Sequence, residues 1–281
     1  MYIHATARTG PHEGRLTLPS GSDRRMARIQ RMAFDAAYSA IGRAGRSSVD
    51  GIFSSTALGC LEDTERFLLE MDENRGTLLS PLPFMRSTHN TMAGQLAMLA
   101  GVRGPNITFS HGLFGLHAAF IQARLHLLEH PDQHVLVLAV DERTPLLSAI
   151  VPALQEGTVP GEGAEAFVLS GERGEHPLAR IEKVALSAST SIAGSWSALT
   201  GAPADQVDHV LIGHDAHGGP TDWLVGGTSV NLSGADGLSG VRTAQLLAAV
   251  IDQLCAGTIQ GRVLIGDRSK DEQGAILLSS C

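Results

Sequence analysis

Cysteine is scarce in this sequence of 281 residues, which contains only Cys60, Cys255 and Cys281. Their spacing matches neither a disulfide framework nor a metal-binding motif, and a sparse, odd number favours a reducing compartment. The first residues also lack the basic segment and the following apolar segment of a secretory signal. We therefore expect a cytoplasmic protein.

Long apolar runs and an excess of basic charge are also missing. Apolar runs such as residues 135–140 have the length of a strand, far short of the roughly 20 residues of a membrane helix. Lys and Arg number 21 against 29 Asp and Glu, which gives a net charge of −8. No basic stripe with interleaved aromatic residues is present, so we expect neither a membrane nor a nucleic-acid partner. With 43% hydrophobic and 18% charged residues, the composition excludes a largely disordered chain.

Glycine, in contrast, is abundant, with 32 residues, and suits closely layered helices and sheets. Amphipathic helical patterns alternate with short apolar runs, which is typical of an α/β layered fold with buried strands. The patterns predict helices over residues 24–41 (capped by Ser22 or Asp23), 64–71, 87–100, 114–128 and 241–254. They predict strands over residues 106–110, 135–140, 166–170, 179–186, 209–212, 262–265 and 275–278, and mark residues 51–54 only as a short apolar segment.

The chain shows a weak sign of internal duplication. Each half ends in an apolar helix, a strand, a glycine-containing turn and a last strand. Residues 171–177 are polar, with two glycines and a proline, and are the best candidate for a joint between the halves. We therefore predict two similar halves, residues 1–175 and 176–281. The alternative is a single α/β domain without a repeat.

Four segments resemble one family. They are GCLEDTE (59–65), STHNTMAGQ (87–95), GPNITFSHG (104–112) and GEGAEAFVL (161–169). Together they resemble β-ketoacyl synthases, particularly the small, truncated relatives called chain-length factors. The resemblance covers most of residues 1–175 and only loosely the rest, through 207–222 and 233–251. It implies a thiolase-like layered αβαβα fold with two similar halves, a trimmed second half and an obligate dimer.

The resemblance also exposes a missing nucleophile. The chemistry of the family needs a cysteine thiolate at a helix N-terminus, where the helix dipole and backbone N–H groups lower the thiol pKa. Counting along the motif from Pro105 places Leu113 there, and a local gap would place Gly112 or His111 there instead. No cysteine lies between Cys60 and Cys255. We therefore predict that the chain has no catalytic residue of this kind.

The histidines of the family are only partly represented. His214 and His217 lie near the position of the first catalytic histidine of the family. Residues 234–237 match the segment of the second catalytic histidine but contain no histidine. A pair such as Ser110 and His111 could suggest a hydrolase, but no Gly-x-Ser-x-Gly elbow is present.

Other cofactor classes find no support in the spacing. A cluster of acidic and histidine residues could imitate a metal site, but its spacing fits no familiar ligand pattern. Its members are Asp208, His209, His214, Asp215 and His217. The glycines of residues 213–219 and 226–227 do not form a dinucleotide fingerprint. We expect neither a metal nor a cofactor.

A ketosynthase fold without its nucleophile can still act through a surface. The resemblance implies a dimer interface and acyl tunnel lined by Phe84, Met85, Thr88, His89 and Met92, joined by Leu113 and Phe114. For each apolar member the alternative is an ordinary core position.

The implied partner is an active ketosynthase in a heterodimer, within a highly reducing type II polyketide system that makes polyene chains. We expect acyl carrier protein to dock mainly on that partner, because this chain offers no obvious basic patch. Two alternatives stay open. One is a stand-alone thiolase-fold acyltransferase or decarboxylase using His111, His217 or Asp236, and the other is a homodimeric acyl-binding protein.

Overall fold

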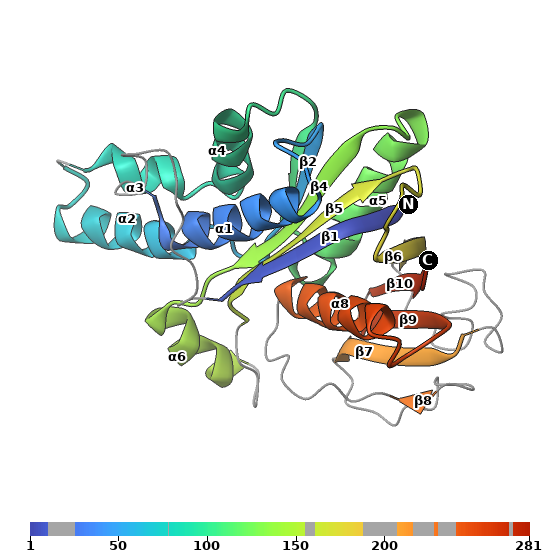
Figure 1. Cartoon of the computed structure of the whole chain (residues 1–281). Helices are drawn as coiled ribbons and strands as arrows, with labels where there is room; N and C mark the ends of the chain where they lie inside the picture. Colours follow the sequence, from blue (N-terminus) through green and yellow to red (C-terminus); the bar gives the residue numbers. More distant parts are fainter. Residues whose placement is uncertain are drawn as a thin grey trace.

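A computed structural model describes most of the chain (Figure 1). The described residues are 1–10, 26–77, 79–154, 161–187, 207–215, 228–229, 240–269 and 272–281. Among them, none of the helices combines the length and apolar character needed to cross a bilayer.

Ten strands form one sheet with the order β3-β2-β4-β5-β1-β6-β10-β9-β7-β8. The first half contributes β1 (Tyr2–Thr9), β2 (Gly51–Ser55), β3 (Asn106–Phe109), β4 (His134–Asp141) and β5 (Gly163–Ser170). The second half contributes β6 (Ala179–Ser187), β7 (His209–Asp215), β8 (Thr228–Ser229), β9 (Arg262–Arg268) and β10 (Gln273–Ser279).

The two sets of five strands have the same topology. Within each set, the second strand in chain order pairs parallel with the third and the fourth, and the fifth pairs antiparallel with the fourth and the first. The sets meet where β1 pairs with β6, Tyr2 opposite Arg180 and Ile3 opposite Ala179. The predicted similarity of the halves is confirmed. Residues 171–177 connect β5 to β6, and the division at residue 175 stays a prediction.

Helices are layered against both halves. Helices α5 (Gly115–Glu129) and α8 (Gly240–Cys255) lie between them and contact strands of each. Phe120 of α5 and Leu247 of α8 share a buried cluster with Val137 of β4 and Ile265 of β9. Helix α1 (Arg28–Arg43) covers the opposite face of the first half. The predicted layered α/β architecture is therefore present.

Strand β4 shows why its run of apolar residues is continuous. Val135 and Val137 face the layer of α5 and α8, whereas Leu136 and Leu138 face α1. Because side chains alternate between the two faces of a strand, a strand covered on both faces needs apolar residues throughout.

The described part of the first half also contains four further helices: α2 (Leu61–Glu73), α3 (Pro81–Arg86), α4 (Thr91–Ala100) and α6 (Pro145–Leu154). Figure 1 shows α2 and α3 extending beyond the sheet. The prediction of one helix over residues 87–100 is wrong, because Ser87 caps α3 and the next helix begins only at Thr91. Helix α1 begins at Arg28, after Ala27, and the predicted caps Ser22 and Asp23 lie outside the described residues.

Candidate functional site

The turn between β3 and α5 is where the resemblance to β-ketoacyl synthases predicts the position of the nucleophile. Strand β3 ends at Phe109, and a short 3-10 turn, Gly112–Phe114, leads directly into α5. Gly112 has a φ of 47°, a left-handed conformation that glycine adopts without steric cost. Leu113 is half-buried and Phe114 is buried. The chain thus builds a strand-to-helix turn at a helix N-terminus, and His111, Gly112 and Leu113 there provide no thiol.

None of the three cysteines lies at the turn before α5. Cys60 precedes α2 at its N-terminus, yet burial, with the carboxylates of Glu142 and Asp63, raises its thiol pKa to about 12. A thiol with so high a pKa remains protonated and inert at neutral pH. Cys255 ends α8 and Cys281 ends the chain, and desolvation raises the pKa of both thiols.

A histidine–carboxylate pair lies at the mouth of the turn. Nε2 of His111 is 3.0 Å from Oε1 and 3.1 Å from Oε2 of Glu272, in the loop between β9 and β10. Ser110 points elsewhere and donates its hydroxyl to the carbonyl oxygen of Ala57, at 3.4 Å. The two neighbours are therefore held in different directions, which disfavours a Ser–His hydrolase arrangement. Sequence reasoning missed Glu272, because no local pattern links it to His111.

A second polar pair is buried behind the turn, within the first helical turn of α5. Nε2 of His117 lies 3.5 Å from Oδ2 of Asp267 on β9, and the hydroxyl of Thr243 on α8 donates to the same oxygen at 2.8 Å. Burial lowers the pKa of His117 to about 3, so its imidazole is neutral at physiological pH. A Cβ atom on Gly274 would lie 2.7 Å from Nε2 of His117, so this position of β10 accommodates only glycine without displacing the ring.

Apart from Met92, the residues predicted to line an acyl tunnel lie in two regions, namely α3 with the loop that follows it and the start of α5. Thr88 and His89 are exposed, and the His89 ring lies so close to Gly59 that a Cβ there would be 2.9 Å from its Cδ2. Leu113 and Phe114 start α5. Phe84 and Met85 lie on α3, with 57% and 66% of their surfaces exposed.

Met92 differs from this group. It is completely buried in the cluster between α1, α4 and the sheet. For Met92 the structure favours the alternative of an ordinary core residue.

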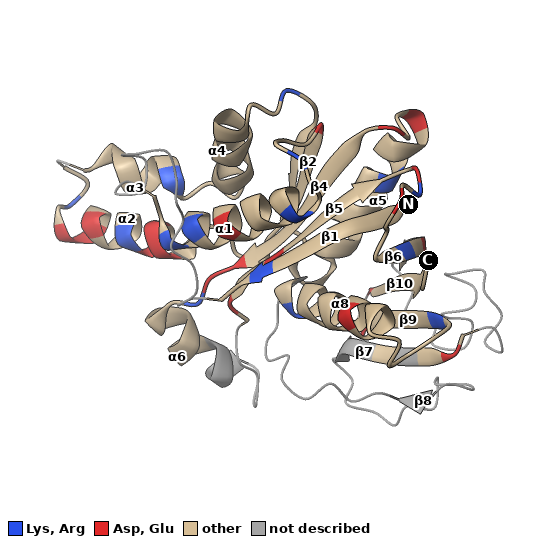
Figure 2. Cartoon of the chain, in the orientation of Figure 1, with Lys and Arg blue, Asp and Glu red and all other residues tan. Residues whose placement is uncertain are grey.

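Apolar side chains are concentrated on α3 and α4. Helix α4 contains no charged residue, as the uniform tan of its ribbon in Figure 2 shows, and Met98 at its C-terminal end is 78% exposed. A groove between α3 and α4 is lined mainly by apolar side chains, among them Leu82, Met85 and Leu99. We call these two helices and their groove the apolar face. Exposed apolar patches are characteristic of interaction sites in general.

Metal ligation finds no support in the described part of the chain, where no three His, Cys, Asp or Glu side chains lie close enough to hold an ion. His217 and Asp236 lie outside the described residues, as does all of the segment 234–237. His214 and Asp215 fall at the end of β7, in a stretch where only the backbone is described.

Comparisons with known proteins agree with this architecture. Residues 8–205 match the family described as beta-ketoacyl synthase, N-terminal domain. No curated protein has a significantly similar sequence. A solved structure described as "The ishigamide ketosynthase/chain length factor" has a TM-score of 0.77 at 16% identity, covering 99% of each chain.

Two further structures share the fold. One is a type II PKS acyl-carrier protein in complex with its ketosynthase bound to the hexaketide, with a TM-score of 0.83 at 13% identity over 100% of this chain and 99% of that one. The other is a beta-ketoacyl synthase from Burkholderia phymatum STM815, with a TM-score of 0.72 at 14% identity over 99% and 93%. These likenesses show a common thiolase-like fold. Because the family match covers more than half of the chain, the chain belongs to the beta-ketoacyl synthase family.

Proposed function

We propose that this chain is a non-catalytic chain-length-factor subunit, which pairs with an active ketosynthase and shapes the acyl tunnel of the pair. The observation that carries the proposal is the turn at the N-terminus of α5. It offers a helix N-terminus of the kind that activates a thiol, but its residues, His111, Gly112 and Leu113, cannot form an acyl thioester. A subunit that cannot hold the growing chain can still determine the space available to it.

The free edge of the sheet supports a partner. Strand β3 is the outermost strand of its half and pairs only with β2 within the described residues. An unpaired edge is a ready template for another strand. Ile107 on this strand is 37% exposed, and α4, which carries the exposed Met98, packs beside the strand. An edge strand together with the apolar face has the composition expected of an obligate interface.

The protruding helix α3 supports a role in the tunnel. The ring of Phe84 packs at a tilt against that of Phe67 of α2, with the ring centroids 5.3 Å apart, and more than half of the surface of Phe84 is still exposed. An aromatic side chain held in this way, on an element that extends beyond the sheet, can close the end of a cavity in a partner. Thr88 and His89, in the loop after α3, complete the proposed lining with Met85, Leu113 and Phe114.

The pathway is proposed as highly reducing type II polyketide biosynthesis of the polyene type. The neighbours described as a ketosynthase/chain length factor and as a type II PKS ketosynthase with its acyl-carrier protein support a type II system. The polyene product and a second half trimmed relative to complete ketosynthases rest on the resemblance to small chain-length factors. The second repeat, residues 179–279, is shorter than the first, residues 2–170. Acyl carrier protein is proposed to reach the pair through the partner.

Co-expression tests the proposal. The tagged chain is expressed with and without the ketosynthase encoded beside it, and the mass of the soluble species is measured. We expect a 1:1 complex, and a chain that is insoluble or unstable alone. Ile107→Lys should weaken the complex by at least about tenfold, whereas Leu146→Lys, at an exposed position on α6, should leave it intact. A stable homodimer that does not bind the ketosynthase would refute the proposal.

A second candidate is a stand-alone decarboxylase, and the pair of His111 and Glu272 favours it. In this reaction the C–C bond of a malonyl thioester breaks, carbon dioxide leaves, and the enolate carbon takes up a proton. A histidine at the helix N-terminus is placed to stabilise the enolate oxygen. The test measures whether the purified chain releases carbon dioxide from malonyl carrier protein. Release that is lost in His111→Ala but kept in His130→Ala would support this candidate over the first.

A further inference from the structure

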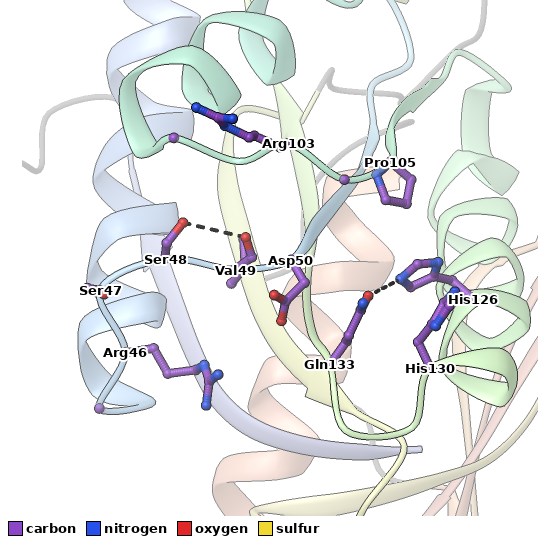
Figure 3. A pocket seen from close by; sticks show the side chains of 13 residues that line it. Arg46, Ser47, Ser48, Val49, Asp50, Arg103, Pro105, His126, His130 and Gln133 are labelled. Atoms are coloured by element: carbon purple, nitrogen blue, oxygen red, sulfur yellow. Dashed lines mark hydrogen bonds between the residues drawn. The ribbon is translucent and has the colours of Figure 1, made fainter.

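A pocket lies at the end of the sheet opposite to the α5 turn. It is formed by the three loops that precede the parallel strands β2, β3 and β4, namely residues 45–50, 101–105 and 130–133, together with His126 of α5 (Figure 3). The turn at α5 follows the carboxyl end of β3, whereas this pocket borders the amino end of the same strand. The pocket therefore shares no residue with the site proposed above.

Two glycines direct an arginine to each side of the pocket. Gly45 follows α1 and Gly101 ends α4, and both have a φ of 68°. This left-handed conformation ends a helix and turns the chain sharply. Arg46 comes directly after the first of these turns, and Arg103 follows shortly after the second. Figure 3 shows the two arginines on different loops around the pocket.

The loops that carry these arginines are held closely together. A Cβ atom on Gly104 would lie 1.8 Å from the carbonyl oxygen of Asp50, and one on Gly51 would lie 3.3 Å from Pro105. The backbone N–H of Asp50 donates to the carbonyl oxygen of His134 at 2.7 Å. The pocket is therefore a preformed feature of the fold.

The charge of the pocket is positive in a protein that is negative overall. Within the described residues, neither Arg46 nor Arg103 forms an ion pair with a carboxylate. Arg46 instead places Nη1 3.5 Å from Nε2 of His134. The one acidic side chain of the lining, Asp50, already accepts the backbone N–H of His134 at 2.8 Å.

Further polar side chains complete the lining on the opposite side. The rings of His126 and His130 lie 4.9 Å apart, centroid to centroid. Nε2 of His126 is 2.7 Å from Oε1 of Gln133, which leaves the amide N–H groups of Gln133 available to the pocket (Figure 3). A cavity lined by two guanidinium groups without a carboxylate partner among the described residues, two imidazoles and an amide matches the oxygen-rich surface of a phosphate group.

We propose that this pocket binds a small phosphate monoester, attracted by the guanidinium groups of Arg46 and Arg103 that border it. The site is a ligand site additional to the acyl tunnel, and it does not depend on whether the chain has a ketosynthase partner. Phosphate is the favoured anion because a planar guanidinium binds two of its oxygens at once.

The test uses the full-length chain in its soluble form, alone or in complex. Binding of inorganic phosphate, adenosine 5′-monophosphate and 4′-phosphopantetheine is measured by calorimetry, with pantetheine as the probe without phosphate. The double variant Arg46→Gln/Arg103→Gln is compared with Arg66→Gln/Arg173→Gln, which removes two exposed arginines elsewhere. Thermal unfolding of each protein without ligand shows whether either variant alters the fold.

We expect at least one phosphate probe to bind, pantetheine not to bind, and the pocket variant to lose about tenfold or more in affinity while the control variant loses none. The preferred probe distinguishes free phosphate from a nucleotide or a pantetheine ester. An equal loss in both variants, or no binding of any phosphate probe at millimolar concentration, would overturn the proposal. Should the pocket variant unfold, Gln133→Leu provides the second test, with the same expected loss.

Discussion

Nε2 of His117 and Oδ2 of Asp267 lie 3.5 Å apart, with both side chains fully buried. His117 belongs to α5 of the first half and Asp267 to β9 of the second, and Thr243 of α8 donates to the same carboxylate oxygen. One polar cluster therefore joins the two central helices to the second half of the sheet. Its position directly behind the α5 turn links the stability of the halves to the geometry of the candidate site.

The neutral state of His117 makes folding dependent on pH. Burial lowers the pKa of His117 to about 3 from an ordinary value of 6.5, so its contribution to stability is complete above pH 6.5 and is lost as the pH falls toward 3. The loss is at most about 1.4 kcal/mol per pH unit. Urea unfolding between pH 7 and pH 5 should show this slope in the native chain and a shallower slope in His117→Gln. Equal slopes would contradict the assignment.

Glu165 should act in the opposite direction. Its side chain is 2% exposed, and burial raises its pKa to about 8, opposed by Arg8 at 3.9 Å. A raised carboxyl pKa gives stability that is complete below the ordinary value of 4.5 and is lost as the pH rises through about 8. Glu165→Gln should therefore stabilise the chain at pH 8 by a few kcal/mol, on the order of 2–4.

The control for Glu165 is Glu129→Gln, at the exposed end of α5, which should change the unfolding free energy little. The measurement is urea unfolding of both variants at pH 5 and pH 8. A stabilisation that is the same at both pH values would show that Glu165 is not the titrating group.

Two glycines provide a matched pair of substitutions. A Cβ atom on Gly104 would meet the carbonyl oxygen of Asp50 at 1.8 Å, whereas one on Gly94, in α4, has no atom within 4 Å. Gly104→Ala should destabilise the chain by about 2 kcal/mol or more, since backbone must move. Gly94→Ala should stabilise it by about 0.5–1 kcal/mol, because alanine favours the helix. Thermal unfolding of the two variants checks both signs, and a loss of stability in Gly94→Ala would contradict the packing described for α4.

Product length should respond to Phe84. Phe84→Ala removes an exposed ring from α3, so we expect longer products from the reconstituted pair with little loss of stability. Met92→Ala is a poor test, because Met92 is fully buried and its truncation should cost about 2–5 kcal/mol. Mass analysis of the acyl products of Phe84→Ala and of Leu146→Ala, the surface control, checks the prediction. Unchanged product length in Phe84→Ala would exclude Phe84 from the tunnel.

The sequence predicts the central elements well because their patterns are local. The stripe of Leu116, Phe120, Ala123 and Leu127 predicts α5, and all four residues are buried. The continuous apolar run of residues 135–140 predicts β4. Strand β1 was missed because two of its three buried apolar residues are the weakly apolar Ala5 and Ala7. Helices α6 and α3 were not predicted either. Helix α6 contains Pro152, which usually argues against a helix, and α3 is only about one and a half turns long.

The candidate site could be predicted only where its residues are neighbours in the sequence. The turn without a thiol can be found by counting along one segment, and the structure places Leu113 at that turn. Glu272 and Asp267 reach the same region from the other half, and the pocket beside Arg46 and Arg103 needs three loops that are distant in sequence. Contacts of this kind depend on the pairing order of the sheet, which no local pattern encodes.

The most direct test of the central claim is to locate the acyl group. The complex of this chain with its ketosynthase is incubated with acyl carrier protein that bears an acyl group. The intact mass of each subunit is then measured under denaturing conditions. We predict an acyl adduct on the ketosynthase and an unchanged mass for this chain, because its α5 turn holds no thiol and Cys60 is buried with a pKa of about 12. An acyl adduct on this chain would contradict the account.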